Sequence, residues 1–227
     1  MKKRHTVLVT NDDGIDSFFL HTLVHALKHE FEVFVAAPLA EQSWIGRAIS
    51  RDKTVHMANY EKLGCPAWAL DGTPSDCVNI ALSHLMKEKP DFVVSGINIT
   101  HNTGVPLILS SGTVGGAIEG IHWDIPSIAT SLYIDRENRP KIKEHHGYVE
   151  GKTKESLENA AKHTAKFVHY YLQYLPKPLV VYNIITQNTP QWTLSFIKRL
   201  LRVFAWGLFL KKRPMPLSNF QGRRRKK

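Results

Sequence analysis

Two adjacent carboxylates, Asp12 and Asp13, follow the short apolar run His5–Thr10 near the N-terminus. The run is rich in β-branched residues and predicts a buried strand. Carboxylate, hydroxyl and amide oxygens are the ligands that Mg²⁺ and Mn²⁺ prefer. Because a turn after a strand can bring both side chains to one ion, the pair is a candidate site for a divalent cation. The sequence Asn-Asp-Asp-Gly is also typical of an ordinary turn, since these residue types all favour turns.

A second candidate is the stretch Ser110–Thr113, which precedes the predicted helical segment VGGAIEGI. A helix N-terminus offers free N–H groups and partial positive charge, both of which suit a phosphate group. Ser and Thr hydroxyls would add hydrogen-bond donors. The same residues are preferred at helix N-caps, so an ordinary cap explains the stretch equally well. Gly115 and Gly116 weaken a helix and indicate close packing against a sheet or another chain.

Other polar residues carry little information by themselves. Ser43, Asn98 and Asn102 each lie in a predicted loop or turn. The chain has 12 His residues, but the complete HExxH motif of a zinc protease does not occur in it. It also lacks the Gly-x-Ser-x-Gly motif of serine hydrolases and the GxxxxGK[ST] phosphate loop. Nucleophilic serine catalysis and Walker-type ATP hydrolysis are therefore unsupported.

The elements that must position these residues alternate between strands and helices. The predicted strands are His5–Thr10, Phe31–Ala37, Asp91–Ser95, Ser127–Leu132 and Leu179–Asn183, with short strands within Val55–Leu70. The predicted helices are Ser17–His29, a helix opened by Thr73 and Pro74, Gly112–Ile121 and Glu155–Tyr174. This alternation predicts an α/β fold with a mostly parallel sheet and right-handed crossovers.

The predicted sheet also indicates where a functional site should lie. Functional groups in parallel sheets gather beyond the carboxyl ends of the strands. Asn11–Gly14 follows the first strand, Ser43 lies in the loop after the second, and Gly96–Asn98 follows Asp91–Ser95. We therefore expect these three polar clusters at one edge of the sheet.

Composition is that of an ordinary globular chain. The 227 residues are 43% hydrophobic and 22% charged, enough for one α/β domain with a sizeable core. The two cysteines, Cys65 and Cys77, form neither a disulfide framework nor a metal-binding motif. The N-terminus lacks the apolar stretch of a signal peptide, so a cytoplasmic protein is expected.

The net charge of +10 is distributed unevenly. Residues 1–158 carry 16 Lys and Arg against 20 Asp and Glu, whereas residues 159–227 carry 14 Lys and Arg and no acid. The basic character therefore belongs to the C-terminal part and says little about the candidate site. Within that part, Ile197, Leu200, Leu201, Phe204 and Leu208 follow helical spacing.

Six co-linear motifs together resemble the SurE family. They are VLVTNDDGID (7–16), APLAEQSWIG (37–46), DGTPSDCVNIAL (71–82), PDFVVSGIN (90–98), SGTVGGAIEG (111–120) and IPSIATS (125–131). The resemblance implies a Rossmann-like three-layer fold over residues 1–185, here a SurE-like phosphatase domain. Residues 186–227 are expected to form a divergent basic tail, either helical or disordered.

The resemblance also implies a function. Members of this family are divalent-metal-dependent 5′/3′-nucleotidases that form dimers or tetramers. One Mn²⁺ or Mg²⁺ per subunit would be held by the ligands Asp12, Asp13, Ser43 and Asn98. The phosphate of a nucleoside monophosphate would contact Asn102, Ser111, Gly112 and Thr113. Asp12, Asn102 and Thr113 would be the catalytic residues, with Asp12 helping to activate water.

Two other readings of the chain stay open. A haloacid-dehalogenase-type phosphatase also uses an early Asp motif, but it requires Asp-x-Asp, whereas these carboxylates are adjacent. A catalytically impaired SurE-like protein could instead bind nucleic acid or an anionic membrane through the basic tail. The abrupt change of composition also fits a change of reading frame near residues 186–195.

Overall fold

A single sheet organises the computed structural model, which describes residues 4–174 and 181–186. Within these residues, seven strands lie in the order β3-β4-β2-β1-β5-β6-β7. All neighbouring strands are parallel except the pair β3 and β4. The strands are β1 (Thr6–Thr10), β2 (Glu32–Pro38), β3 (Met57–Asn59), β4 (Ala67–Leu70), β5 (Phe92–Ile99), β6 (Ser127–Leu132) and β7 (Val181–Thr186). The predicted α/β fold with a mostly parallel sheet is confirmed.

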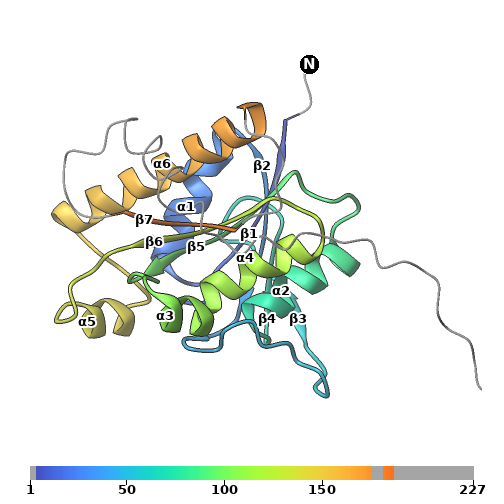
Figure 1. The fold of residues 1–227 in the computed structure, drawn as a ribbon, viewed down its shortest axis with the longest axis horizontal. Helices are drawn as coiled ribbons and strands as arrows, with labels where there is room; N and C mark the ends of the chain where they lie inside the picture. Colours follow the sequence, from blue (N-terminus) through green and yellow to red (C-terminus); the bar gives the residue numbers. More distant parts are fainter. Residues whose placement is uncertain (1–3, 175–180, 187–227) are drawn as a thin grey trace, which may run out of the picture. The chain divides into compact units, whose positions relative to one another are not determined.

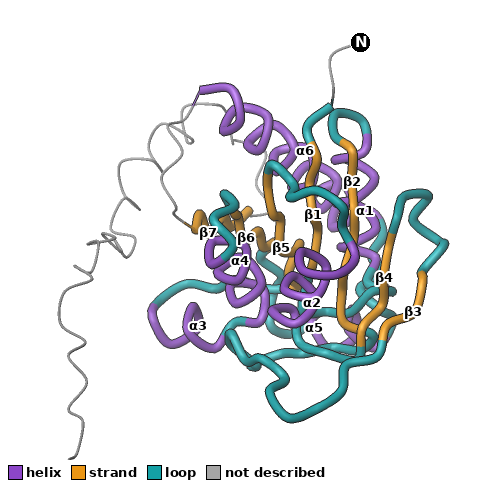
Figure 2. The backbone as a smooth tube through the Cα atoms, turned by 90° about the vertical axis from the view of Figure 1, so that its right-hand side faces the viewer, coloured by secondary structure: helices purple, strands orange, loops and turns teal. Residues whose placement is uncertain are grey.

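Helices cover both faces of the sheet (Figure 1). They are α1 (Phe18–Lys28), α2 (Pro74–Ile80) with its π-helical continuation η1 (Ala81–Leu85), α3 (Val105–Ser110), α4 (Gly112–His122), α5 (Arg139–Glu144) and α6 (Gly151–Tyr174). Helices α1 and α6 pack together on one face, and α2 and α4 pack together on the other. Figure 2 shows the two layers from the side. The three-layer, Rossmann-like arrangement expected from the sequence is present.

The central strand β1 explains why its sequence is continuously apolar. Val7 and Val9 belong to the core under α1 and α6, whereas Leu8 belongs to the core under α2. All three side chains are fully buried. A parallel strand that is covered on both faces has no solvent side, so its apolar residues do not alternate with polar ones.

The helix starts follow local signals in the sequence. Thr73 caps α2 through a capping box with Asp76, and Pro74 occupies the first turn. The 24-residue α6 begins at Gly151, four residues before the predicted start. In the described part of the chain, no helix is both long enough and apolar enough to cross a membrane.

Two features differ from the prediction. Strand β5 runs to Ile99 rather than ending at Ser95, with an irregular register between Ser95 and Asn98. Glycine at position 96 allows the backbone of β5 to continue beside β6. Its φ is +134°, and the Cβ of any other residue there would lie only 2.8 Å from Thr130 Cγ2. The short helices α3 and α5 were not predicted, since six residues are too few to establish a helical period.

Candidate functional site

The two carboxylates lie directly beyond the carboxyl end of β1. Strand β1 pairs with β2 on one side and with β5 on the other, so the order of strands reverses at this point. In open α/β sheets, ligands bind in the crevice at such a reversal. The predicted edge of the sheet is therefore confirmed as the place where Asp12 and Asp13 lie.

Asp12 is tied to the N-terminus of α4. The Thr113 hydroxyl donates a 2.6 Å hydrogen bond to Asp12 Oδ1, although the two residues are 101 positions apart. Thr113 is fully buried and Asp12 is 5% exposed. Gly112 allows this approach, because a Cβ there would lie 2.8 Å from Asp12 Cβ and 3.0 Å from Gln42 O. The Ser110–Thr113 stretch thus reaches Asp12 through the hydroxyl of Thr113.

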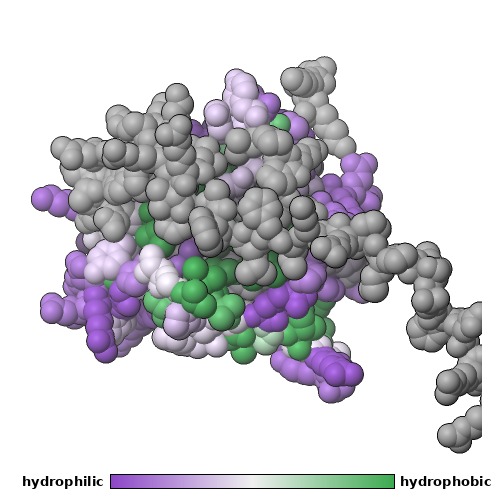
Figure 3. Space-filling view, in the orientation of Figure 1, coloured by the Kyte–Doolittle hydropathy of each residue, from purple (hydrophilic) through white to green (hydrophobic). Residues whose placement is uncertain are grey.

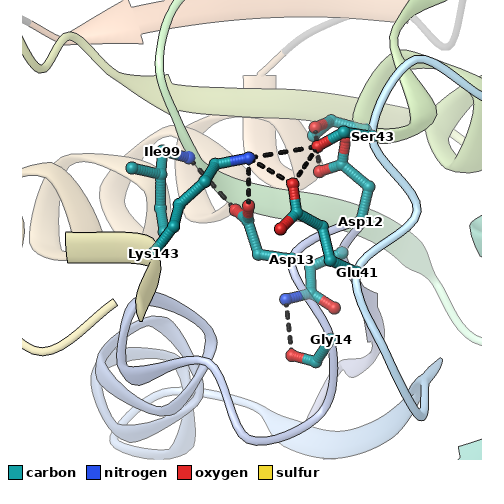
Figure 4. A network of polar contacts seen from close by, with 9 residues as sticks. Asp12, Asp13, Gly14, Glu41, Ser43, Ile99 and Lys143 are labelled. Carbon is teal, nitrogen blue, oxygen red and sulfur yellow. Dashed lines mark hydrogen bonds and ion pairs between the residues drawn. The ribbon is translucent and has the colours of Figure 1, made fainter. Parts of the chain in front are cut away.

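Asp13 lies at the centre of a polar network (Figure 4). The backbone N–H of Ile99 donates to Asp13 Oδ2 at 3.1 Å, and Lys143 Nζ lies 3.8 Å from Asp13 Oδ1. The same ammonium donates to Ser43 Oγ at 3.1 Å and to the carboxylate of Glu41. The Ser43 hydroxyl in turn donates to Glu41. Asp13 is therefore contacted by the end of β5 and by α5, and the loop that carries Glu41 and Ser43 joins the network through Lys143.

Backbone hydrogen bonds hold the loop that carries Ser43 over the site. The N–H of Gln42 donates to Asp12 O at 2.7 Å, and the N–H of Gly46 donates to Ser110 O at 2.8 Å. Arg47 in the same loop pairs with the buried Glu119 of α4 at 2.7 Å. These contacts place Ser43 next to the carboxylates even though its own side chain is exposed.

Burial governs the electrostatics of the pair. Loss of hydration raises the pKa of Asp12. The hydrogen bond from Thr113 lowers this pKa but does not offset the effect of burial. Burial and the charge of Asp12 together raise the pKa of Asp13 to about 8. Burial disfavours the charged form of Lys143, but the hydrogen bond to Glu41 and the charge of Asp13 raise the pKa of this amine above its ordinary value. Each carboxyl thus favours its protonated form more than an exposed one would, and a cation beside the pair stabilises the charged form.

The remaining predicted site residues are buried nearby. Asn98 is 5% exposed and lies in β5, next to the residue that binds Asp13. Asn102 is 6% exposed, and its side-chain Nδ2 has no hydrogen-bond partner within the described residues. Ser111 caps α4, because its hydroxyl accepts the N–H of Val114 at 3.1 Å. In the described part of the chain, no hydrogen bond joins Asn98 or Asn102 to either carboxylate.

The donor set fits a hard divalent cation. No group of three His, Cys, Asp or Glu side chains suited to a metal occurs among the described residues, so a closed, all-protein cage of that kind is absent from them. Mg²⁺ and similar ions bind through one or two carboxylates and complete their shell with water and substrate phosphate. Asp12 and Asp13 would supply two carboxylates, Ser43 a hydroxyl and Asn98 an amide. The ammonium of Lys143 already lies against Asp13 as a cation.

Two residues of this network were not among the predicted site residues. Glu41 lies within the motif APLAEQSWIG, only two positions before Ser43. Its place in this loop could have identified it as a site residue. Nothing in the sequence could have identified Lys143 as a site residue. It belongs to a polar stretch without periodicity and contacts Ser43, which is 100 positions away in the chain. The predicted tail helix around Ile197–Leu208 and its possible nucleic-acid or membrane contacts lie outside the described residues.

The family model described as "Survival protein SurE" matches residues 7–204. The chain belongs to the SurE family. Among SurE relatives, the "5'-nucleotidase SurE" of Methanocaldococcus jannaschii is 39% identical over 201 residues, which cover 86% of this chain and 72% of the relative. That of Maridesulfovibrio salexigens is 45% identical over 126 residues, which cover 55% of this chain and 50% of the relative.

A solved SurE structure has the same fold. The crystal structure of the SurE protein from Aquifex aeolicus has a TM-score of 0.65 and 32% sequence identity. The match covers 81% of this chain and 66% of the Aquifex chain. The chain therefore spans about two thirds of that structure, and 48% to 61% of several other curated SurE relatives that it matches.

Proposed function

We propose that residues 1–185 form a divalent-metal-dependent phosphatase that hydrolyses nucleoside monophosphates, that is, a 5′/3′-nucleotidase. The observation that carries the proposal is the pair Asp12 and Asp13 at the strand-order reversal. Asp12 is 5% exposed and bonded to Thr113 of α4, and the Asp13 side chain is 4% exposed. The relatives from Methanocaldococcus jannaschii and Maridesulfovibrio salexigens are named 5′-nucleotidases, which supports the same reaction.

Asp12, Asp13, Ser43 and Asn98 would hold one Mn²⁺ or Mg²⁺. A bound divalent cation polarises a phosphoryl oxygen and makes a water molecule more acidic. The protein side chains contribute the rest of the chemistry. The Thr113 hydroxyl donates to Asp12 Oδ1 and fixes the orientation of that carboxylate, which would help to activate the attacking water.

The phosphate would lie on the side of the site formed by Asn102 and α4. The buried Nδ2 of Asn102 lacks an acceptor among the described residues, and an unsatisfied buried donor is costly unless a ligand supplies one. The N-terminus of the 11-residue α4 starts at Gly112 and presents N–H groups with partial positive charge. Together these donors would stabilise charge on the phosphoryl oxygens.

We further propose that the chain acts as a homodimer or homotetramer. An exposed apolar surface on α3 supports this assembly, since Val105 is 67% and Leu109 is 72% exposed. Figure 3 shows hydrophobic surface on this face of the molecule, around the position of α3. Light scattering coupled to size exclusion will measure the mass, and Leu109→Glu should lower it if this surface is the interface.

Phosphate release tests the reaction. AMP, GMP and para-nitrophenyl phosphate should each be hydrolysed in the presence of Mn²⁺ and not in EDTA. Asp12→Asn and Asp13→Ala should abolish release while the thermal unfolding transition persists. Turnover by Asp13→Ala with Mn²⁺, or no metal-dependent release by the folded wild-type protein, would refute the proposal.

A further inference from the structure

Helix α5 delivers an ammonium group to the carboxylate site. Lys143 Nζ lies 3.8 Å from Asp13 Oδ1 and 3.1 Å from Ser43 Oγ, and it also donates to Glu41 (Figure 4). Its side chain is only 31% exposed, which is low for a lysine on a short helix at the protein surface. The amine thus points into the site rather than into solvent.

The position of α5 does not depend on this amine. At the start of the helix, the side chain of Arg139 donates from Nε to Ile134 O at 2.8 Å. Beyond its end, the N–H of Phe18 donates to His146 O at 2.8 Å. Gly147 packs so closely that a Cβ there would lie 3.2 Å from Ile99 Cδ1. Contacts on both sides of Lys143 therefore hold the segment in place and present the side chain to Asp13.

The groups that face this ammonium overlap with the proposed metal ligands. Asp13 and Ser43 are both assigned to the metal, whereas Glu41 is not. Ser43 Oγ accepts from Lys143 and donates to Glu41 at the same time, so a metal ion on this oxygen would share it with the ammonium group. Two cations on one carboxylate also repel each other strongly where water is largely excluded.

We propose that Lys143 is an internal competitor for the metal, held against Asp13 and Ser43 when the metal is absent and displaced when the metal binds. The inference rests on the metal site of the proposed function. Without metal, Lys143 is the cation that faces Asp13, and so it lowers the cost of a charge on that buried carboxylate. Glu41 gives the displaced ammonium a partner beside the site. Lys143 is thus a positioning residue that sets metal affinity.

Direct metal binding tests the competition. Calorimetric titration with Mn²⁺ on the full chain, without substrate, should give a Kd at least about tenfold lower for Lys143→Met than for wild type, which corresponds to about 1.4 kcal/mol. Methionine keeps an unbranched apolar stem and removes only the charge. Lys143→Arg should bind as the wild type does. Lys141→Met removes a charge from an exposed position of the same helix and serves as the matched control.

The outcomes separate this inference from the proposed function. If Asp13→Ala abolishes Mn²⁺ binding but Lys143→Met binds no more tightly than wild type, the metal site stands and the competition is refuted. If Lys141→Met tightens binding as much as Lys143→Met, the effect is one of general charge and the competition is again refuted. If neither wild type nor Lys143→Met binds Mn²⁺, both the metal site and the inference fail.

Chemical labelling gives a second readout on the wild-type protein. Limited acetylation followed by mass spectrometry should show Lys143 modified several-fold faster with saturating Mg²⁺ than in EDTA, because displacement frees the amine. Lys141 in the same peptide region should show no change. Equal rates at Lys143 with and without a metal that is shown to bind would refute displacement.

Discussion

Gly115 in α4 supports the loop that carries Ser43, and Gly115→Ala should disturb the site through that loop. A Cβ on Gly115 would lie well inside contact distance of Gly46 O, 2.8 Å from Gly46 C and 3.0 Å from Arg47 Cα. These are backbone atoms, so no side chain can rotate away, and the loop must move by roughly 1 Å to reach ordinary contact. Ser43 lies three residues before Gly46 in this loop.

The effect on stability combines two opposing terms. Alanine is favoured over glycine inside a helix by about 1 kcal/mol, whereas overpacking of a tight contact costs about 1–3 kcal/mol. The expected net loss is therefore about 0–2 kcal/mol, or up to roughly 8 °C in Tm. A misplacement of about 1 Å at a catalytic group can cost about 100-fold in rate. Mn²⁺ affinity and phosphate release should therefore fall much more than stability.

Gly120→Ala is the matched control at the other end of the same helix. A Cβ on Gly120 would lie 2.9 Å from Val93 Cγ2, far along the strand from the carboxylates. Thermal unfolding should show at most a modest loss of stability in either variant, whereas Mn²⁺ titration and phosphate release should be impaired only in Gly115→Ala. Equal metal affinity in Gly115→Ala and wild type, or equal losses in the two variants, would show that the Gly115 contact does not position Ser43.

Three further changes test the site. Burial and the charge of Asp12 raise the pKa of Asp13 from 3.8 to about 8, so the folded state binds more protons between these values. The metal-free protein should lose stability as the pH rises through that window, and thermal melts in EDTA should show a flatter profile for Asp13→Asn. Thr113→Val removes the 2.6 Å bond to Asp12 and should slow phosphate release by about tenfold or more, whereas Thr113→Ser should retain it. Trp44 is 73% exposed with a φ of 63°, so Trp44→Gly should stabilise the protein by about 0.5–1 kcal/mol in chemical denaturation, and a loss of stability would contradict this reasoning.

Local patterns in the sequence were enough to predict the framework of the site. The apolar run that becomes β1 and the helical period that becomes α1 each encode their element within about ten residues, since hydrophobic burial acts on every side chain along the segment. The rule that parallel strands carry ligands at their carboxyl ends then placed Asp12 and Asp13 at the correct edge. Gly115 and Gly116 correctly indicated close packing.

Contacts between distant residues were decided only by the tertiary structure. Asn98 was expected in a loop, yet it lies in β5, because Gly96 lets the strand continue along β6. Lys143 belongs to a six-residue helix without a readable period. The sequence by itself determined the core strands, the longer helices and which carboxylates follow the first strand. The packing of α5 and the Ser43 loop decided which charges those carboxylates meet, because a contact across 100 residues leaves no periodic trace along the chain.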